Sequence, residues 1–205
     1  MVSKLSQNGV AGFILSNGAL SGDGTEKAIP KQLIENNLVE AIIILPGNMF
    51  YTTDISVTLW ILNRNKTART VEYDDTTHHY RNRGQEVLFM DLRQIGEPFE
   101  KKYIQFSSEH IQEIAKTFHS WQQDNSDYQD IAEYCYSANI DEIKAKDYSL
   151  VPSKYIEFIN RDENVNFDEK MTALQSELSQ LFKQEQQSKQ ELLKVFDELG
   201  FGIDV

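Results

Sequence analysis

Residues 10–65 read VAGFILSNGALSGDGTEKAIPKQLIENNLVEAIIILPGNMFYTTDISVTLWILNRN, and they carry the strongest pattern of strands and helices in the chain. Two apolar runs, 10–16 and 39–45, have the length and the β-branched content of strands that are covered on both faces. Residues 26–37 between them have a helical pattern, and Thr25 stands where it can cap the first turn. Strand, helix and strand form a βαβ unit, so we expect the two strands to be parallel.

A third apolar run, residues 55–62, follows the short link 46–54, which has no helical pattern. A parallel return needs a longer crossover, usually through a helix, so we expect this strand to run antiparallel to its neighbour. The sequence thus predicts an α/β fold whose sheet ends in a reversed strand.

Several blocks of this chain, taken in order, carry a resemblance to a known family. The blocks are FILSNGAL at 13–20, IPKQLI at 29–34, VEAIIILP at 39–46, NMFYTTDI at 48–55, LWILNRNK at 59–66, VLFMDLR at 87–93 and DYSLVPSKYI at 147–156. They resemble the modification subunit of type I restriction-modification systems, an N6-adenine DNA methyltransferase. The resemblance implies a Rossmann-like methyltransferase sheet and methyl transfer from S-adenosylmethionine to adenine N6.

Two motifs of that family are missing from this sequence. The family's cofactor-binding Gly-rich turn and its catalytic Asn-Pro-Pro-aromatic tetrapeptide precede the strand at Val10, where only nine residues stand, and no Pro-Pro pair occurs. We therefore expect the C-terminal portion of a modification subunit, either a truncated reading frame or an expressed fragment. S-adenosylmethionine is expected to bind the complete subunit and not this chain alone, and no catalytic residue is expected here.

Composition and charge bear on whether the chain binds a membrane or DNA. No apolar run approaches ~18 residues, so a soluble cytoplasmic protein without a membrane partner is expected. The net charge is −12, and the six Lys/Arg and five Asp/Glu of residues 1–70 leave −13 on the remainder. Because DNA-binding surfaces neutralise phosphates with Lys and Arg, we expect DNA contact only within a complex.

The single Cys135 is expected to be an inert buried thiol. The neighbouring His78 and His79 do not predict a metal site.

Two loops are expected at the carboxyl edge of the parallel strands, where α/β proteins bind ligands. Asn17 and Gly18 are predicted to form an active-site rim, although a plain turn also explains the glycines there. The loop 46–54 is predicted to receive the target adenine. Enzymes that modify a base swing it out of the duplex and hold it against an aromatic face. Phe50, or failing it Tyr51, suits that role beside Asn48; the alternative is an aromatic side chain that plugs the sheet edge.

The remaining chain divides by pattern into three parts: residues 1–95 as part of the methyltransferase sheet, 96–165 as a connecting helical and irregular segment, and 166–205 as a long C-terminal helix. Residues 67–85 indicate an exposed polar loop, and residues 87–92 indicate a short strand. A helix is predicted over 107–121, capped by Ser107 or Ser108, with a core face of Ile111, Ile114, Ala115 and Phe118. Residues 127–136 fit either a helix or a strand.

The C-terminal helix, predicted over 168–199, carries an apolar seam at 3-4 spacing. The residues predicted to dock on a partner are Leu174, Leu178, Leu181, Leu192, Val195 and Leu199. The seam either packs on its own domain or docks on a partner helix. The resemblance implies docking on the specificity subunit, within a complex that also holds the restriction subunit. Two other functions stay open: a non-enzymatic module that binds the specificity subunit or self-associates, and an unrelated nucleotide-binding domain.

Overall fold

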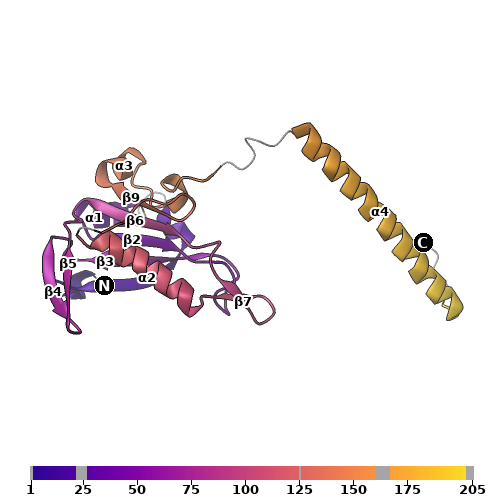
Figure 1. Cartoon of the computed structure of the whole chain (residues 1–205), viewed down its shortest axis with the longest axis horizontal. Coiled ribbons are helices and arrows are strands. Elements are labelled where there is room, and N and C mark those ends of the chain that lie inside the picture. Colours follow the sequence, from indigo (N-terminus) through magenta and orange to yellow (C-terminus); the bar gives the residue numbers. More distant parts are fainter. Residues whose placement is uncertain (1, 22–26, 125, 160–166, 202–205) are drawn as a thin grey trace. The chain divides into compact units, whose positions relative to one another are not determined.

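A computed structural model describes residues 2–21, 27–124, 126–159 and 167–201 of the chain (Figure 1). It divides into two compact units, residues 1–159 and residues 160–205. The first unit contains every strand that the structure describes, including three from the segment expected at 96–165. The three-part division with a boundary at residue 95 stays a prediction.

The first unit is built on a five-stranded mixed sheet. In sheet order, the strands are β1 (Val10–Ser16), β3 (Val57–Asn63), β2 (Val39–Ile44), β6 (Glu86–Asp91) and β9 (Cys135–Asn139). Strand β3 runs antiparallel to both β1 and β2, β2 and β6 are parallel, and β9 runs antiparallel to β6. The α/β class and the reversed strand are confirmed.

The place of the reversed strand differs from the prediction. Strand β3 does not end the sheet but lies between β1 and β2, which run in the same direction without pairing. The link 46–54 folds into a tight loop, so β3 returns directly alongside β2 and then pairs with β1 on its other side. Local patterns fix the direction of a strand but not which two neighbours it acquires.

Burial separates the two strands that looked alike in sequence. Every residue of β2 is buried, as predicted for a strand covered on both faces. Strand β1 is an edge strand, and its Val10 and Ile14 are 55% and 46% exposed. The prediction of two covered faces is therefore wrong for β1 within the described part of the chain.

Helices cover both faces of the sheet. Successive residues of a strand point to opposite faces, and Ile42 and Ile43 of β2 accordingly belong to two different cores. The first core includes Ile34 of α1 (Ala28–Glu35) and Ile143 of α3 (Ile140–Ala145). The second includes Trp121 of α2 (Ser108–Gln122). The sheet thus lies between α1 and α3 on one face and α2 on the other (Figure 1).

Helix α2 begins as predicted at its N-cap. The hydroxyl of Ser107 accepts a hydrogen bond from the backbone N–H of His110, whose ring accepts from the N–H of Ser107, a reciprocal capping box. Ile114 and Phe118 pack against the second core, but Ile111 is 56% exposed. The predicted core face is therefore wrong at Ile111. Helix α1 is shorter than predicted, and the cap expected at Thr25 lies outside the described residues.

The segment 67–85 is a β-hairpin rather than a loop. Strands β4 (Arg69–Tyr73) and β5 (Thr76–Tyr80) pair antiparallel, and Asp74 and Asp75 between them have φ of 50° and 56°. Two left-handed residues make the turn that suits the twist of a hairpin. The hairpin is largely polar and exposed, so no apolar alternation marks it in the sequence. Residues 127–136 prove to be neither helix nor strand until Cys135, where β9 starts.

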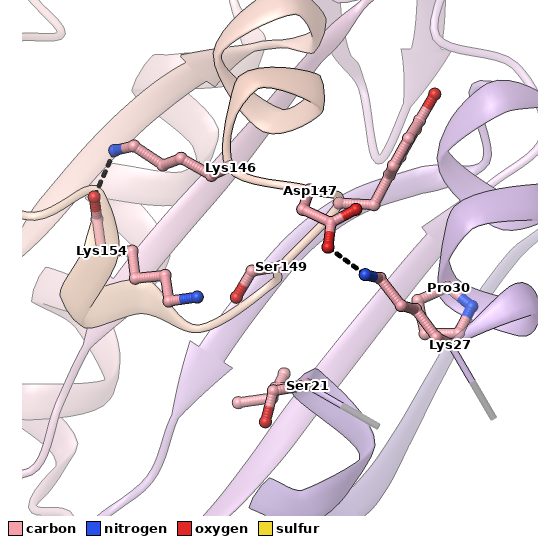
Figure 2. Close-up of a pocket in the computed structure, with 9 residues that line it drawn as sticks. Ser21, Lys27, Pro30, Lys146, Asp147, Ser149 and Lys154 are labelled. Carbon is pink, nitrogen blue, oxygen red and sulfur yellow. Dashed lines mark hydrogen bonds and ion pairs between the residues drawn. The ribbon is translucent and has the colours of Figure 1, made fainter. Parts of the chain in front are cut away.

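Short elements complete the first unit. They are η1 (Val2–Lys4), η2 (Asn17–Leu20), η3 (Pro152–Lys154) and the hairpin of β7 (Glu97–Phe99) and β8 (Tyr103–Gln105). After α3 the chain passes beside η2, where the N–H of Leu150 donates to the carbonyl oxygen of Leu20 at 3.0 Å. A small cavity lies between this segment and the residues that flank α1 (Figure 2).

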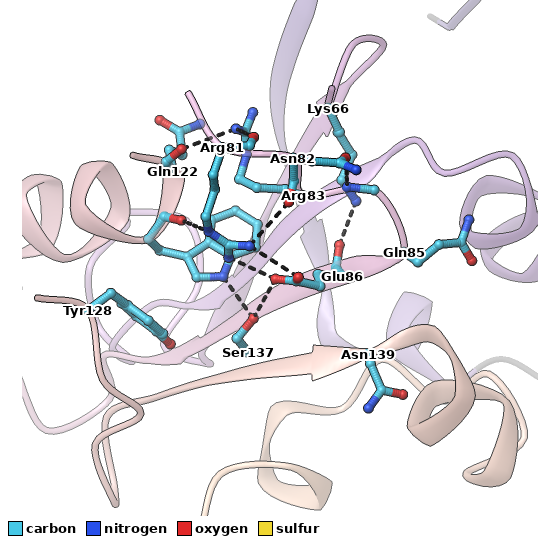
Figure 3. A network of polar contacts seen from close by, with 12 residues as sticks. Lys66, Arg81, Asn82, Arg83, Gln85, Glu86, Gln122, Tyr128, Ser137 and Asn139 are labelled. Atoms are coloured by element: carbon cyan, nitrogen blue, oxygen red, sulfur yellow. Dashed lines mark hydrogen bonds and ion pairs between the residues drawn. The ribbon is translucent and has the colours of Figure 1, made fainter. Parts of the chain in front are cut away.

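A polar network joins α2, β6 and β9 on the second face. Arg81 pairs with Glu86 at 2.7 Å, Ser137 donates to the same carboxylate at 3.3 Å, and the indole N–H of Trp121 donates to Ser137 at 2.8 Å (Figure 3). Nearby, Lys66 donates to the carbonyl oxygen of Val39 at 2.7 Å, and burial lowers the pKa of this lysine to about 8. These bonds connect the starts of β2 and β6 to the hairpin and to α2.

Beneath this network lies a fully buried ion pair. Glu40 and Arg83 are both 0% exposed, and Nε of Arg83 donates to Oε1 of Glu40 at 2.9 Å. The amide of Gln122 donates to the same oxygen at 3.0 Å. A charged residue inside an apolar strand is thus held by Arg83 from the connection between β5 and β6 and by Gln122 at the end of α2.

We expect Glu40→Ala to lower the free energy of unfolding by about 3–5 kcal/mol, because it leaves the Arg83 guanidinium buried without its counter-charge. Urea unfolding followed by circular dichroism measures the loss. The double variant Glu40→Leu with Arg83→Leu should regain much of it, since neither charge is then stranded. A midpoint for Glu40→Ala equal to that of the parent chain would contradict the role of the pair.

The described part of the second unit, residues 167–201, forms one long helix, α4 (Phe167–Glu198), close to the predicted span. It ends at Glu198, and Gly200 shortly after it has a φ of +78°, the left-handed conformation that commonly terminates helices. None of its described residues is buried, and the six seam residues are between 51% and 66% exposed. The seam is therefore an apolar surface that the described residues of the second unit do not themselves cover.

Candidate functional site

The two predicted site loops leave the sheet at the same edge. Ser16 at the end of β1 is paired with Val57, and Ile44 at the end of β2 is paired with Thr58, so both strands end where β3 begins. Strand β6 ends in register at Asp91, opposite Ile44. This is the carboxyl edge of the parallel strands, the edge at which α/β proteins bind ligands.

The predicted rim is anchored to the sheet by a side-chain hydrogen bond. Asn17 opens η2, and its side-chain oxygen accepts from the hydroxyl of Thr58, which is buried, at 2.6 Å. Leu20 at the other end of η2 is buried in the first core. Gly18 is exposed and does not have positive φ, so a tight 3-10 turn accounts for it. Gly22 and Gly24 lie outside the described residues.

The predicted target-base loop is closed by its own backbone. The N–H of Asn48 donates to the carbonyl oxygen of Asp54 at 3.1 Å, and the N–H of Thr53 donates to that of Phe50 at 3.3 Å. Asn48 has a left-handed φ of 57°. A Cβ on Gly47 would lie 2.9 Å from the carbonyl oxygen of Asp54, so only glycine allows this close approach. The loop therefore has one defined shape.

Its two aromatic residues have different surroundings. Phe50 is half-buried and packs against the second core, whereas Tyr51 is 70% exposed. The ring of Tyr51 meets that of Tyr103 edge to face, with centroids 4.7 Å apart at 72°. The structure thus brings Asn48, Phe50 and Tyr51 together, and it is Tyr51 that offers an accessible ring.

The β7–β8 hairpin supports this loop, which the sequence did not indicate. The N–H of Ile104 donates to the carbonyl oxygen of Asn48 at 3.0 Å, and Lys102 pairs with Asp54 at 3.0 Å. The Asp54 carboxylate raises the pKa of Lys102. Strands of three residues carry too little periodicity to be recognised, and an aromatic contact between distant segments leaves no local signal.

The site offers stacking and hydrogen bonding rather than acid–base chemistry. Asp91 at the edge is 5% exposed, and its carboxylate is held by Arg93, whose pKa it raises. No group of three or more His, Cys, Asp or Glu side chains within the described residues is placed to hold a metal ion. Cys135 is buried, and burial raises the pKa of its thiol. What the described edge can hold is a flat, apolar or aromatic group against Tyr51.

The sheet has a reversed strand between two parallel ones, and an aromatic loop lies at its carboxyl edge. This arrangement is consistent with a methyltransferase-like fold. The chain belongs to the N-6 DNA methylase family, whose model matches residues 1–164. Among the described helices, none has both the length and the apolar character that crossing a membrane requires.

Two proteins to which the chain is similar are type I methylase subunits. The chain is 36% identical over 203 residues to the type I restriction enzyme HindI methylase subunit of Haemophilus influenzae, covering 98% of this chain and 42% of that protein. It is 30% identical to the MjaIX methylase subunit of Methanocaldococcus jannaschii, covering 95% of this chain and 33% of that protein. The chain therefore spans less than half the length of these relatives.

Solved structures agree with membership of the N-6 DNA methylase family. The type I restriction-modification methyltransferase subunit of Streptococcus thermophilus matches with a TM-score of 0.58 and 26% identity, over 74% of this chain and 27% of that one. The EcoKI M protein matches in fold, with a TM-score of 0.52 and 15% identity over 85% of this chain and 40% of that chain. The resemblance predicted from the sequence blocks is confirmed.

Proposed function

We propose that this chain is the C-terminal part of a type I modification subunit, which as a complete protein transfers a methyl group from S-adenosylmethionine to adenine N6 in DNA. The observation that carries the proposal is the Asn48–Tyr51 loop, closed and presented at the carboxyl edge of a methylase-family sheet. The cofactor turn and the catalytic tetrapeptide would belong to the part of the subunit that this chain does not span. The complete subunit would work in the cytoplasm.

Strand β1 supplies the site at which that part would join. Among the described strands, β1 pairs only with β3, and its outer edge and its apolar Val10, Ile14 and Leu15 remain exposed. Proteins normally protect or cover such an edge, because unpaired backbone groups invite pairing with another strand. A further strand of the complete sheet would satisfy these groups and cover the apolar side chains.

The target-base loop would hold the flipped adenine. Flipping costs a few kcal/mol of unpairing and unstacking, which stacking on an aromatic side chain offsets in part. Tyr51 is accessible for that contact, and Phe50 supports it from the core or takes the contact itself after a small rearrangement. Asn17 and Gly18 would line the rim on the same edge.

Helix α4 would dock on the specificity subunit through its seam, and the restriction subunit would join the same complex. The net charge of −12 disfavours DNA binding by the chain alone. The specificity subunit would thus bring the DNA, and its recognition sequence would belong to that subunit.

Methyl transfer by a chimera tests this proposal. In the chimera, this chain replaces the segment that it matches in the HindI methylase subunit, and labelled S-adenosylmethionine reports transfer to DNA in the presence of the specificity subunit. We expect transfer by the chimera and none by this chain with the same specificity subunit, because only the chimera has the cofactor and catalytic motifs. Transfer by the chain alone would overturn the proposal, as would a folded chimera that binds the cofactor and the specificity subunit but never methylates DNA.

A further inference from the structure

The cavity beside α1 has a volume of about 160 Å³ and lies between segment 146–154 and the residues that flank the helix. Its polar lining comes from Ser21, Lys27, Lys146, Asp147, Ser149 and Lys154. Three lysines against one carboxylate make this a basic site in a chain whose net charge is −12. In Figure 2, Lys27 and Asp147 lie on one side of this space and Ser149 and Lys154 on the other, whereas the ammonium group of Lys146 points away toward the backbone carbonyl of Lys154.

Two of the three ammonium groups are not neutralised by a salt bridge. Lys27 pairs with Asp147, and that hydrogen bond is the main cause of the lowered pKa of the carboxyl. Lys146 donates to the uncharged backbone carbonyl of Lys154. The Lys154 side chain makes no hydrogen bond or salt bridge with any described residue, although its charge also helps to lower the pKa of Asp147. Among the described residues that line it, the cavity therefore has a surplus of positive charge.

A buried hydroxyl in the same wall lacks a partner. Ser149 is 7% exposed, and its Oγ makes no hydrogen bond with a described residue. Buried side-chain polar atoms are nearly always hydrogen-bonded, so an unpartnered one calls for an explanation. In Figure 2 this hydroxyl points into the space between Lys154 and Ser21. A ligand oxygen placed there would accept its proton.

The start of α1 adds a third favourable element. Lys27 is the N-cap of this eight-residue helix and provides no side-chain cap. The first backbone N–H groups of a helix have no partner within the helix, and with the helix dipole they attract an anion. On the opposite wall, Asp147 and Tyr148 have φ of 56° and 57°, which fixes the unusual path of the loop.

We propose that this cavity binds a single phosphoryl group. Its volume of about 160 Å³ is well above the ~10–15 Å³ that one water molecule needs in a cavity, so there is room for a phosphoryl group. The group is either free phosphate or a phosphodiester of the DNA backbone. Ser21 follows directly on the η2 rim, so a phosphodiester is within reach of DNA held at that rim, and this second source rests on the proposed function.

Titration of the ¹⁵N-labelled 205-residue chain with inorganic phosphate, against sodium chloride at equal ionic strength, tests the site. We expect saturable shifts of the amide resonances of Ser21, Ala28 and Ser149 that chloride does not produce. Lys154→Gln should weaken the affinity for phosphate about tenfold, as expected for the loss of one charge-assisted hydrogen bond. Ser149→Ala should weaken it several-fold and remain folded by circular dichroism.

Lys4→Gln is the matched control, since Lys4 is exposed on η1 and its loss changes the net charge equally. It should leave the affinity for phosphate unchanged. Lack of saturation at tens of millimolar phosphate, or equal affinity in the parent, Lys154→Gln and Ser149→Ala chains, would overturn the proposal.

The methylating chimera shows whether the bound phosphoryl group is free phosphate or part of the DNA backbone. If Lys154→Gln there weakens DNA binding and lowers its salt dependence while Lys4→Gln does not, the ligand is a DNA phosphodiester. If DNA binding is unchanged while phosphate binding is weakened, the ligand is free phosphate and the site stands. The phosphate titration does not depend on methylation, so a failure of the proposed function leaves its result intact.

Discussion

Replacing Leu178 and Leu192 together by aspartate should abolish co-purification of this chain with the specificity subunit. Both residues lie on the α4 seam and are 51% and 58% exposed. Burying six such side chains contributes roughly 9–18 kcal/mol at ~1.5–3 kcal/mol each, against an association cost of ~4–15 kcal/mol. Two buried carboxylates without partners remove that margin, because unpaired charges are strongly disfavoured in an apolar interface. Affinity pull-down with a tagged specificity subunit measures the loss.

The helix itself offers a matched control. At ~100° per residue, Ser176 and Gln190 lie on the face opposite the seam, and Ser176→Asp with Gln190→Asp adds the same two charges at the same separation. That variant should co-purify normally. Retained binding by the seam variant would rule out the seam as the interface, and unfolding of the whole chain would mean that the seam belongs to an internal core. Light scattering of the unmixed chain shows whether the seam instead pairs two copies.

Removal of the accessible ring from the target-base loop should have the second largest effect. Base–aromatic stacking is worth ~1–3 kcal/mol, so removal of the stacking ring should lower methylation by the chimera roughly five- to 150-fold. Phe50→Ala and Tyr51→Ala are compared, together with Phe50→Trp and Tyr51→Phe, which keep a ring and should retain more activity. Single-turnover methylation rates at saturating DNA give the comparison.

The different burial of Phe50 and Tyr51 distinguishes the two candidates for the stacking ring. Phe50 packs on the second core, so Phe50→Ala should also lower the thermal midpoint, whereas Tyr51→Ala should not. Tyr73 on β4 is 73% exposed, close to the 70% of Tyr51, and Tyr73→Ala is therefore the control. A loss confined to Tyr51→Ala assigns the stacking ring to Tyr51. Normal methylation by both alanine variants would show that the loop is structural only.

Elements with a strong local pattern could be predicted from the sequence. Strand β2, strand β6, helix α2 with its Ser107 cap and helix α4 all appear within a few residues of their predicted spans. Their apolar periodicity or capping residues lie within the element itself. The antiparallel direction of β3 also followed from the chain, because the link before it is too short for a helical crossover.

Features that depend on distant partners could not be predicted. The position of β3 between β1 and β2 is a matter of strand pairing, and the exposed β4–β5 hairpin lacks an apolar pattern. The shared edge of the two site loops was predictable from strand direction alone. The support of Tyr51 by Tyr103, and the meeting of Lys27 with Asp147, join segments that are far apart in sequence.

We propose that this chain is one part of a methylase whose cofactor site lies in another part. Titration calorimetry of the purified chain with S-adenosylmethionine tests it most directly, with the chimera as the positive control. We expect saturable heat from the chimera and none from this chain across the micromolar range, because the cofactor-binding motif is absent from its 205 residues. Micromolar or tighter binding of S-adenosylmethionine by the chain alone would contradict the account.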